Sequence, residues 1–194
     1  MSAIERGAYH LATIPELVEP QRSNTFEFVI TDIDGIRRAA QDDTQSETIS
    51  NAQEVIRMSV KSASVPTFTQ NPIPIQRGNS TIKLPGTPTF NEGQVVVNDY
   101  IGLDGKSVLV AWQNLSYNPK TDKIGTAAAY KKTCYLLEYT PDNEKLVRQW
   151  VLQGCWVSGL TMPEFNHEQG NELRTVTATI QYDRGWMEMP DTEA

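Results

Sequence analysis

The sequence LVRQWVLQGCWV at residues 146–157, followed by LRTVTATIQY at residues 173–182, decides the fold. The first run is long enough for a strand that spans the height of a domain, because a strand rises about 3.3 Å per residue. Its period of two predicts one face with Trp150, Leu152 and Trp156 and an opposite face with Gln149, Val151, Gln153 and Cys155. A loop over residues 158–166 separates the two runs.

The second run alternates more regularly than any other part of the chain. Thr175, Thr177, Thr179 and Gln181 occupy the positions between the apolar residues Val176, Ala178, Ile180 and Tyr182. Such alternation is typical of a strand with one face in the core. Neither run carries the residue types of a catalytic site. We therefore interpret both as the frame of a mainly β protein that serves assembly.

Length and charge limit the possible functions. The chain has 194 residues, which favours one domain, and its formal charge is −7. Tight binding of nucleic acid through phosphates needs clustered Lys and Arg, so the charge argues against it. No run approaches the roughly 18 apolar residues of a membrane span, and we expect no secretion signal and folding in a cytoplasm. The two cysteines, Cys134 and Cys155, are expected to be buried and reduced.

The first half of the chain is expected to contain an arm, two strands and a long loop. Residues 1–23 hold two prolines, mixed charge and only a short apolar set (Leu11, Ile14, Leu17 and Val18), which suits an extended N-terminal arm. A strand follows at residues 26–30, and the polar residues 36–53 form an exposed loop. Residues 54–65 are expected to be a second strand, in which Ile56, Met58 and Val60 face the core and Arg57, Ser59 and Lys61 face outward.

The Pro-rich residues 66–88 predict edges and turns, because proline cannot sit in a central strand. Two short edge segments are expected at residues 73–75 and 81–84, and a strand at residues 94–100. One helix is predicted over residues 104–116, with Asp104 as N-cap and an apolar face of Val108, Trp112 and Leu115, beside Leu109 and Ala111. A strand at residues 130–139, a turn at residues 141–144 and a C-terminal tail at residues 189–194 complete the chain.

No catalytic, cofactor-binding or metal-binding residues are predicted. His10 and His167 lie far from any nucleophile motif, and we interpret both as solvated surface histidines. Asp32-Ile33-Asp34-Gly35 resembles the start of a calcium loop but lacks the later ligands, so a turn is favoured. Tyr130-Lys131-Lys132 is too small for a nucleic-acid patch. The four tryptophans could form a carbohydrate platform, but three lie in patterned elements and are expected in the core.

Several short motifs follow one another along the chain. They include Phe26-Glu27-Phe28-Val29-Ile30, the segment from Gly78 to Gly86, Gly154-Cys155-Trp156-Val157, the Met162-Pro163 loop and Trp186-Met187-Glu188. In this order and spacing, residues 24–188 resemble the tail tube proteins of contractile-tailed, T4-like bacteriophages and, more distantly, the tube proteins of type VI secretion. The arm before Ser23 and the 36–53 loop are longer than the family pattern.

The resemblance implies a β-sandwich or barrel-like tail-tube fold with one flanking helix. It implies a late, non-enzymatic virion protein that forms hexameric rings, stacked into a rigid tube inside a contractile sheath for DNA ejection. The implied partners are copies of the chain, the tail sheath protein, the baseplate tube-initiator, and tape measure protein and DNA in the lumen, without a cofactor or membrane. Arg57 and Lys61 do not suit an acidic lumen wall, so the lumen face stays unassigned.

Three alternatives remain open. A baseplate tube-initiator or tail completion protein would have the same fold but few copies per particle. A carbohydrate-binding β-sandwich would need exposed aromatic residues in a groove, and an enzyme would need residues that the sequence does not nominate.

Overall fold

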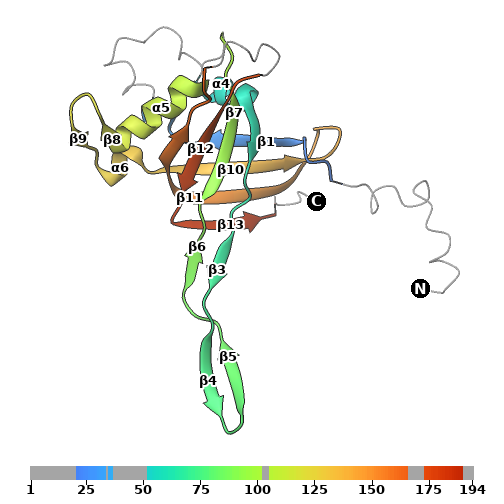
Figure 1. The fold of residues 1–194 in the computed structure, drawn as a ribbon. Coiled ribbons are helices and arrows are strands. Elements are labelled where there is room, and N and C mark those ends of the chain that lie inside the picture. The colour runs from blue at the N-terminus through green and yellow to red at the C-terminus, as the bar shows by residue number, and fades with distance from the viewer. Residues whose placement is uncertain (1–20, 34, 37–51, 102–104, 166–172, 190–194) are drawn as a thin grey trace, which may run out of the picture.

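The computed structural model describes residues 21–33, 35–36, 52–101, 105–165 and 173–189, which fold mainly into β-strands (Figure 1). The principal sheet contains β1 (Phe26–Ile30), β2 (Val60–Ala63), β7 (Gly93–Asn98), β10 (Lys132–Tyr139), β11 (Leu146–Thr161), β12 (Thr175–Gln181) and β13 (Arg184–Glu188). Three further antiparallel pairs are β3 (Phe68–Gln70) with β6 (Pro88–Phe90), β4 (Ile73–Arg77) with β5 (Ser80–Leu84), and β8 (Tyr117–Asn118) with β9 (Lys123–Ile124). The helices are α4 (Ala52–Ser59), α5 (Gly105–Ser116) and α6 (Ala127–Tyr130).

The long strand β11 connects two four-stranded sheets. Its first half pairs with β10 and β13 in a sheet of order β1-β10-β11-β13, which we call the first sheet. Its second half pairs with β12 in a sheet of order β11-β12-β7-β2, the second sheet. The strands of the two sheets run in crossing directions (Figure 1). Because β1 and β2 end the strand path without pairing to each other, the described strands do not form a closed barrel.

A β-bulge at Gly154 makes the corner between the sheets. Leu152 pairs with Cys134, but Cys155 pairs with Lys132, so β11 contains one extra residue at this place. Gly154 has φ of 70°, a left-handed conformation that costs glycine little. Bulges of this kind bend a strand and let it pass from one sheet to another.

The hydrophobic core lies between the two sheets and the helices α4 and α5. Val176, Ala178 and Ile180 are buried, which confirms the predicted alternation of β12. Trp112 of α5 is completely buried, and its Nε1 donates a hydrogen bond of 2.8 Å to the carbonyl oxygen of Tyr130. The predicted helix and its apolar face are therefore confirmed within residues 105–116. The free cysteines Cys134 and Cys155 are completely buried, as predicted.

The prediction of a strand over residues 54–65 is wrong for its first half, which is the helix α4. The buried positions Ala52, Val55, Ile56 and Ser59 follow the i, i+3, i+4, i+7 spacing of a helix face. Met58, predicted to face the core, is 61% exposed. The alternation of Ile56, Met58 and Val60 misled the interpretation because it has the period of a strand, whereas in the helix Met58 lies on the solvent side. The structure thus has α4 and the short α6 in addition to the one predicted helix.

The face prediction for β11 is wrong beyond Gly154. The bulge moves Cys155 and Val157 to the core side with Leu152, whereas Trp156 turns outward and contacts Tyr130, with ring centroids 6.0 Å apart. A strict period of two cannot anticipate an inserted residue.

The two predicted edge segments are present as β4 and β5, and they belong to a much longer hairpin. The pairs β2–β7, β3–β6 and β4–β5 follow one another, and the outer two pairs project far from the body (Figure 1). We call residues 68–90 the projecting hairpin.

Several predictions fall on residues outside the described ranges. These are most of the arm (1–20) and of the loop (37–51), the N-cap Asp104, His10 and His167, and the end of the tail (190–194). Ile36, assigned to the start of the loop, is instead a core residue that is 1% exposed.

Candidate assembly surfaces

The projecting hairpin leaves a complete aliphatic face uncovered. In the register of β4 and β5, Ile73 pairs with Leu84 and Ile75 with Ile82, so all four side chains lie on the same face. Each of them is between 43% and 54% exposed. A two-stranded hairpin is at best marginally stable alone in water, and these side chains gain little burial in the subunit. The described part of the chain therefore leaves this face open to a partner.

The projecting hairpin has a positive net charge, whereas the net charge of the whole chain is negative. It contains Arg77 and Lys83 and no Asp or Glu, whereas the whole chain carries −7. Arg77 lies at the tip, where Gly78 with φ of 61° supports the turn. Neither cation forms an ion pair with another described residue. Their charges are free to meet acidic groups of a partner.

The outer face of the second sheet is polar but almost uncharged. The side chains of β12 that point away from the core are three threonines and a glutamine, and the neighbouring strands add amides, hydroxyls and the apolar side chains of Val96 and Trp156. The positions are Thr175, Thr177, Thr179, Gln181, Gln94, Asn98 and Thr161. Lys61, at the edge strand β2, is the only charged residue of the four paired segments. This surface has no strong attraction for either sign of charge.

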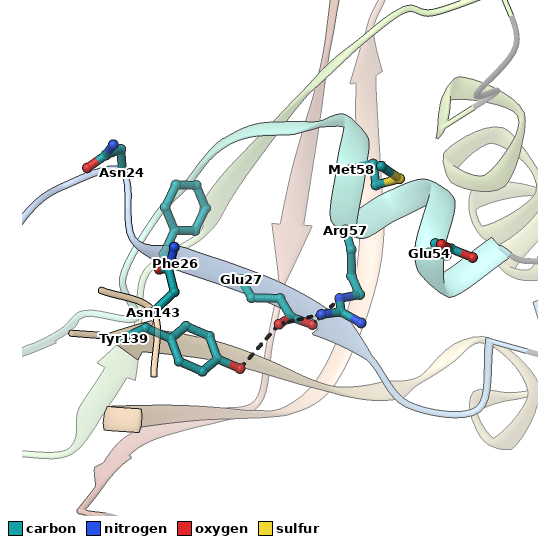
Figure 2. A pocket seen from close by; sticks show the side chains of 8 residues that line it. All are labelled: Asn24, Phe26, Glu27, Glu54, Arg57, Met58, Tyr139 and Asn143. Carbon is teal, nitrogen blue, oxygen red and sulfur yellow. Dashed lines mark hydrogen bonds and ion pairs between the residues drawn. The ribbon is translucent and has the colours of Figure 1, made fainter. Parts of the chain in front are cut away.

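A pocket of about 590 Å³ lies where α4 meets the edge strand β1 (Figure 2). Glu27 extends into it and accepts a hydrogen bond of 3.2 Å from Tyr139 Oη, while Arg57 Nε lies 2.5 Å from its carboxylate. Burial, followed by the nearby Glu27 carboxylate, raises the pKa of Tyr139. Because its carboxylate is already bound by a guanidinium and a phenol, Glu27 fixes α4 to β1. It is poorly placed to act as a base.

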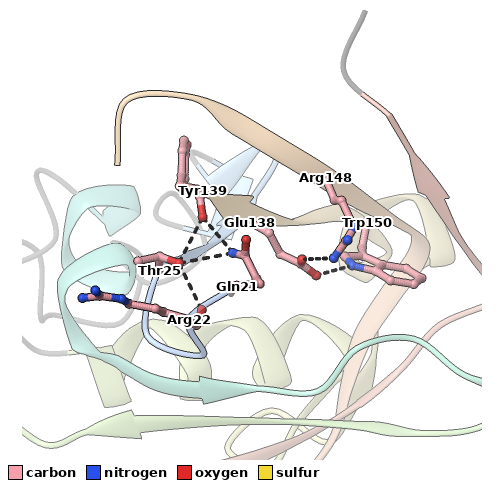
Figure 3. Close-up of polar contacts among 7 residues, drawn as sticks. All are labelled: Gln21, Arg22, Thr25, Glu138, Tyr139, Arg148 and Trp150. Atoms are coloured by element: carbon pink, nitrogen blue, oxygen red, sulfur yellow. Dashed lines mark hydrogen bonds and ion pairs between the residues drawn. The ribbon is translucent and has the colours of Figure 1, made fainter. Parts of the chain in front are cut away.

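Polar contacts fasten the start of the described chain to the end of β10 (Figure 3). Gln21 Nε2 donates to the carbonyl oxygen of Tyr139 at 2.7 Å, and Thr25 Oγ1 donates to the same oxygen at 3.0 Å. Nearby, Trp150 Nε1 donates to Glu138 Oε1 at 2.7 Å, and Arg148 pairs with the other oxygen at 3.3 Å. Sequence periodicity did not reveal these contacts, because they join residues far apart in the chain.

The motifs weighed for chemistry do not converge on a site. Asp32 pairs with the buried Lys132 at 2.5 Å, and Asp34, the second aspartate of the motif interpreted as a turn, lies outside the described residues. Within the described ranges, no group of three or more His, Cys, Asp and Glu is placed to hold a metal ion. The same ranges contain no helix that is long and apolar enough to cross a membrane.

The tryptophans do not form a carbohydrate platform. Trp112 is in the core, Trp150 packs against it, and Trp156 contacts Tyr130, so these three are not available as an exposed stacking surface. Trp186 alone is substantially exposed, at 37%. The tryptophans are therefore used mainly in packing and do not form a sugar-stacking surface.

The uncovered hairpin and the crossed sheets define a protein made to assemble with other chains. Comparison with known families agrees: residues 24–185 match the family model described as T4-like virus tail tube protein gp19. The chain therefore belongs to the T4-like tail tube protein family and is a structural subunit of a phage tail tube. This confirms the resemblance seen in the sequence.

Individual relatives support the same assignment. The tail tube protein gp19 of Enterobacteria phage T4 is 23% identical over 124 residues, which cover 63% of this chain and 76% of that protein. A chain from the sheath-tube complex of an extracellular contractile injection system (PVC) in the extended state has a TM-score of 0.65. It is 16% identical, and the match covers 94% of this chain and 100% of that one. The sheath/tube terminator of the PVC system gives a TM-score of 0.62, at 16% identity, with 87% of this chain and 96% of that chain covered.

Proposed function

We propose that copies of this chain form hexameric rings that stack into a rigid, hollow tube within a contractile sheath. The observation that carries the proposal is the projecting hairpin, whose aliphatic face is left exposed by the described part of its own subunit. A heterologous contact between identical subunits repeats from copy to copy, and it therefore builds rings or filaments. Such a subunit needs no catalytic residues, so its function is mechanical.

The outer face of the second sheet is the surface best suited to line the channel. Its threonines, glutamines and asparagine present hydroxyls and amides, and the segments from β11, β12 and β7 carry no charged residue. Phosphates are held by Lys and Arg, so DNA and the tape measure protein would pass this wall without adhering. Arg57, which seemed incompatible with a lumen position, belongs to α4 and is paired with Glu27. Of the two cations that argued against an acidic lumen wall, only Lys61 therefore belongs to this sheet.

The remaining surfaces are assigned to other tail proteins. The tail sheath protein would contact the outside of the tube, and the baseplate tube-initiator would contact its first ring. Assembly would take place in the host cytoplasm before the tail joins the virion. The N-terminal residues 1–23 are proposed to be an arm that contributes to assembly rather than to the core.

Electron microscopy of the concentrated, purified chain tests the main proposal. We expect hollow tubes with sixfold end views, and a chain that stays monomeric at all concentrations would contradict the proposal. The lumen assignment is tested separately with Thr177→Cys in assembled tubes. A bulky polyethylene glycol maleimide should modify this cysteine more slowly than one introduced by Thr121→Cys at the β8–β9 turn. Equal rates would place the second sheet elsewhere.

Copy number separates a tube subunit from a tube-initiator or tail completion protein. Quantitative mass spectrometry of purified particles should find this chain in amounts comparable to the sheath protein. A handful of copies per particle would instead identify a protein that starts or ends the tube.

A further inference from the structure

We infer that the aliphatic face of the β4–β5 hairpin packs across the outer face of the first sheet of a neighbouring copy, with Arg77 beside Trp186 and Glu188. The inference rests on the proposed self-assembly and adds the receptor surface for the hairpin. Because both surfaces of this contact are specified residue by residue, tubes can form even if this particular contact is absent.

The receptor is a row of apolar side chains that crosses all four strands of the first sheet. Val29 of β1 pairs with Tyr135 of β10, and Tyr135 pairs with Val151 of β11. Val151 in turn pairs with Trp186 of β13. Residues directly opposite one another in a sheet share a face, so the four form one continuous row. We call it the apolar row.

The apolar row lies on the side of the sheet away from the core. None of its members belongs to the core cluster, although their strand neighbours Phe28, Leu136 and Leu152 do. A shallow hollow of about 160 Å³ opens on this face between Val29, Tyr135, Leu137 and Gln149. Val151 itself is 5% exposed, whereas Val29 and Tyr135 are half-buried and Trp186 is 37% exposed, so these three side chains form the accessible part of the row beside the hollow. An apolar surface with a hollow is suited to receive aliphatic side chains.

The dimensions of the two surfaces match. The apolar row crosses three gaps between strands, each about 4.8 Å wide, and is therefore about 14 Å long. The four residue steps from Ile73 to Arg77, at about 3.4 Å each, also span about 14 Å. The hairpin can therefore lie along the row with Ile73 and Ile75 over its apolar members and Arg77 at one end.

The acidic residues at the two ends of the apolar row determine at which end Arg77 lies. Glu27, near the Val29 end, is already paired with Arg57. Glu188, near the Trp186 end, accepts a hydrogen bond of 2.6 Å from Trp186 Nε1 and forms no ion pair within the described part of the chain. Arg77 at this end would meet an available carboxylate and the half-exposed ring of Trp186, to which a guanidinium is attracted.

Disulfide trapping tests the contact directly. The native cysteines are completely buried, so introduced cysteines dominate the reaction. We expect the Ile75→Cys/Tyr135→Cys chain, once assembled and mildly oxidised, to form covalent multimers on non-reducing gels. Two control pairs should remain mostly monomeric: Thr81→Cys/Tyr135→Cys, on the other hairpin face, and Ile75→Cys/Thr177→Cys, on the second sheet. Tubes that form without cross-linking Ile75→Cys to Tyr135→Cys would overturn the inference but leave the proposed function intact.

A charge exchange provides a second test at exposed positions where folding is not at risk. Arg77→Glu and Glu188→Arg should each raise the protein concentration needed for assembly about tenfold, because an attraction becomes a repulsion. The double variant should recover most of this loss. Lys83→Glu makes the same charge change on the opposite hairpin face and should have a smaller effect. Absence of rescue, or an equal effect of Lys83→Glu, would contradict the assigned direction. If the wild-type protein formed no tubes at all, that result would contradict both the inference and the proposed function.

Discussion

The carboxylate of Asp183 fills the space above Gly154 that any side chain at position 154 would need. Lys131 Nζ holds this carboxylate with contacts of 2.7 and 2.8 Å to its two oxygens. The glycine is also the bulge residue at which β11 leaves the first sheet for the second. One position thus combines a left-handed backbone, a close side-chain approach and the corner of the fold.

Gly154→Ala should therefore destabilise the subunit. The left-handed backbone and the displaced Asp183 together should lower the free energy of unfolding by about 1–3 kcal/mol, measured by urea titration. Gly159→Ala is the matched control in the same strand, because a Cβ there meets no atom within 4 Å. It should change the free energy by less than about 1 kcal/mol. Similar losses in both variants would show that the corner does not depend on Gly154.

Ile180→Asp should abolish folding. Ile180 is 2% exposed on the core face of β12, so the substitution would bury a carboxylate without a partner. Such burial exceeds the few kcal/mol that most single substitutions cost, and we expect insoluble protein or loss of the cooperative thermal transition in circular dichroism. Thr179→Asp places the same charge on the opposite face and should melt cooperatively. A folded Ile180→Asp variant would contradict the face assignment of β12.

The sequence predicted those elements whose pattern reflects a single physical cause. The residues from Val176 to Tyr182 alternate because one face meets the core and the other meets solvent, and this signal was sufficient for β12. The residues around Ile56 were misread because Ile56, Met58 and Val60 alternate with the period of a strand, although Ile56 and Met58 belong to a helix and Val60 follows its end. Only the burial of Ala52, Val55 and Ser59 distinguishes the helix from a strand.

The assembly surfaces were less accessible to sequence reasoning. The exposed face of β4 and β5 can be recognised only when their register places Ile75 opposite Ile82. The apolar row is composed of residues from four strands, from Val29 to Trp186, and no local pattern links them. The outward face of Trp156 depends in addition on the bulge at Gly154, which reverses the faces of the residues that follow it. Tertiary pairing therefore decides these surfaces.

Deletion of residues 1–20 should leave a folded subunit that assembles less well. The cut preserves Gln21, whose amide donates to the carbonyl oxygen of Tyr139. We therefore expect an unchanged circular dichroism spectrum and a higher protein concentration for tube formation, measured by sedimentation. Deletion of residues 1–23 also removes Gln21 and Arg22, whose carbonyl oxygen accepts from Thr25, and it should lower the melting temperature. Loss of the fold in the shorter deletion would show that the arm belongs to the core.

Alkaline pH should destabilise the subunit through Cys134. Burial, together with a hydrogen bond to Cys155, raises the pKa of the Cys134 thiol well above its ordinary value of 9.0. The folded state keeps the thiol protonated, whereas the unfolded chain releases its proton near pH 9. The contribution to stability is therefore complete below pH 9 and is lost as pH rises from there toward the raised pKa. For one proton the slope reaches at most about 1.4 kcal/mol per pH unit.

Urea titrations between pH 8 and pH 11, with two variants, separate this effect from tyrosine ionisation. Cys134→Ala lowers stability at every pH because it leaves a cavity, but the slope just above pH 9 should become flatter than in the wild type. Tyr182→Phe is the control: burial raises the pKa of Tyr182 from 10.0, so its contribution is lost only at higher pH. It should leave the slope just above pH 9 unchanged. If Cys134→Ala retained the wild-type slope there, the alkaline loss would have to arise from another group.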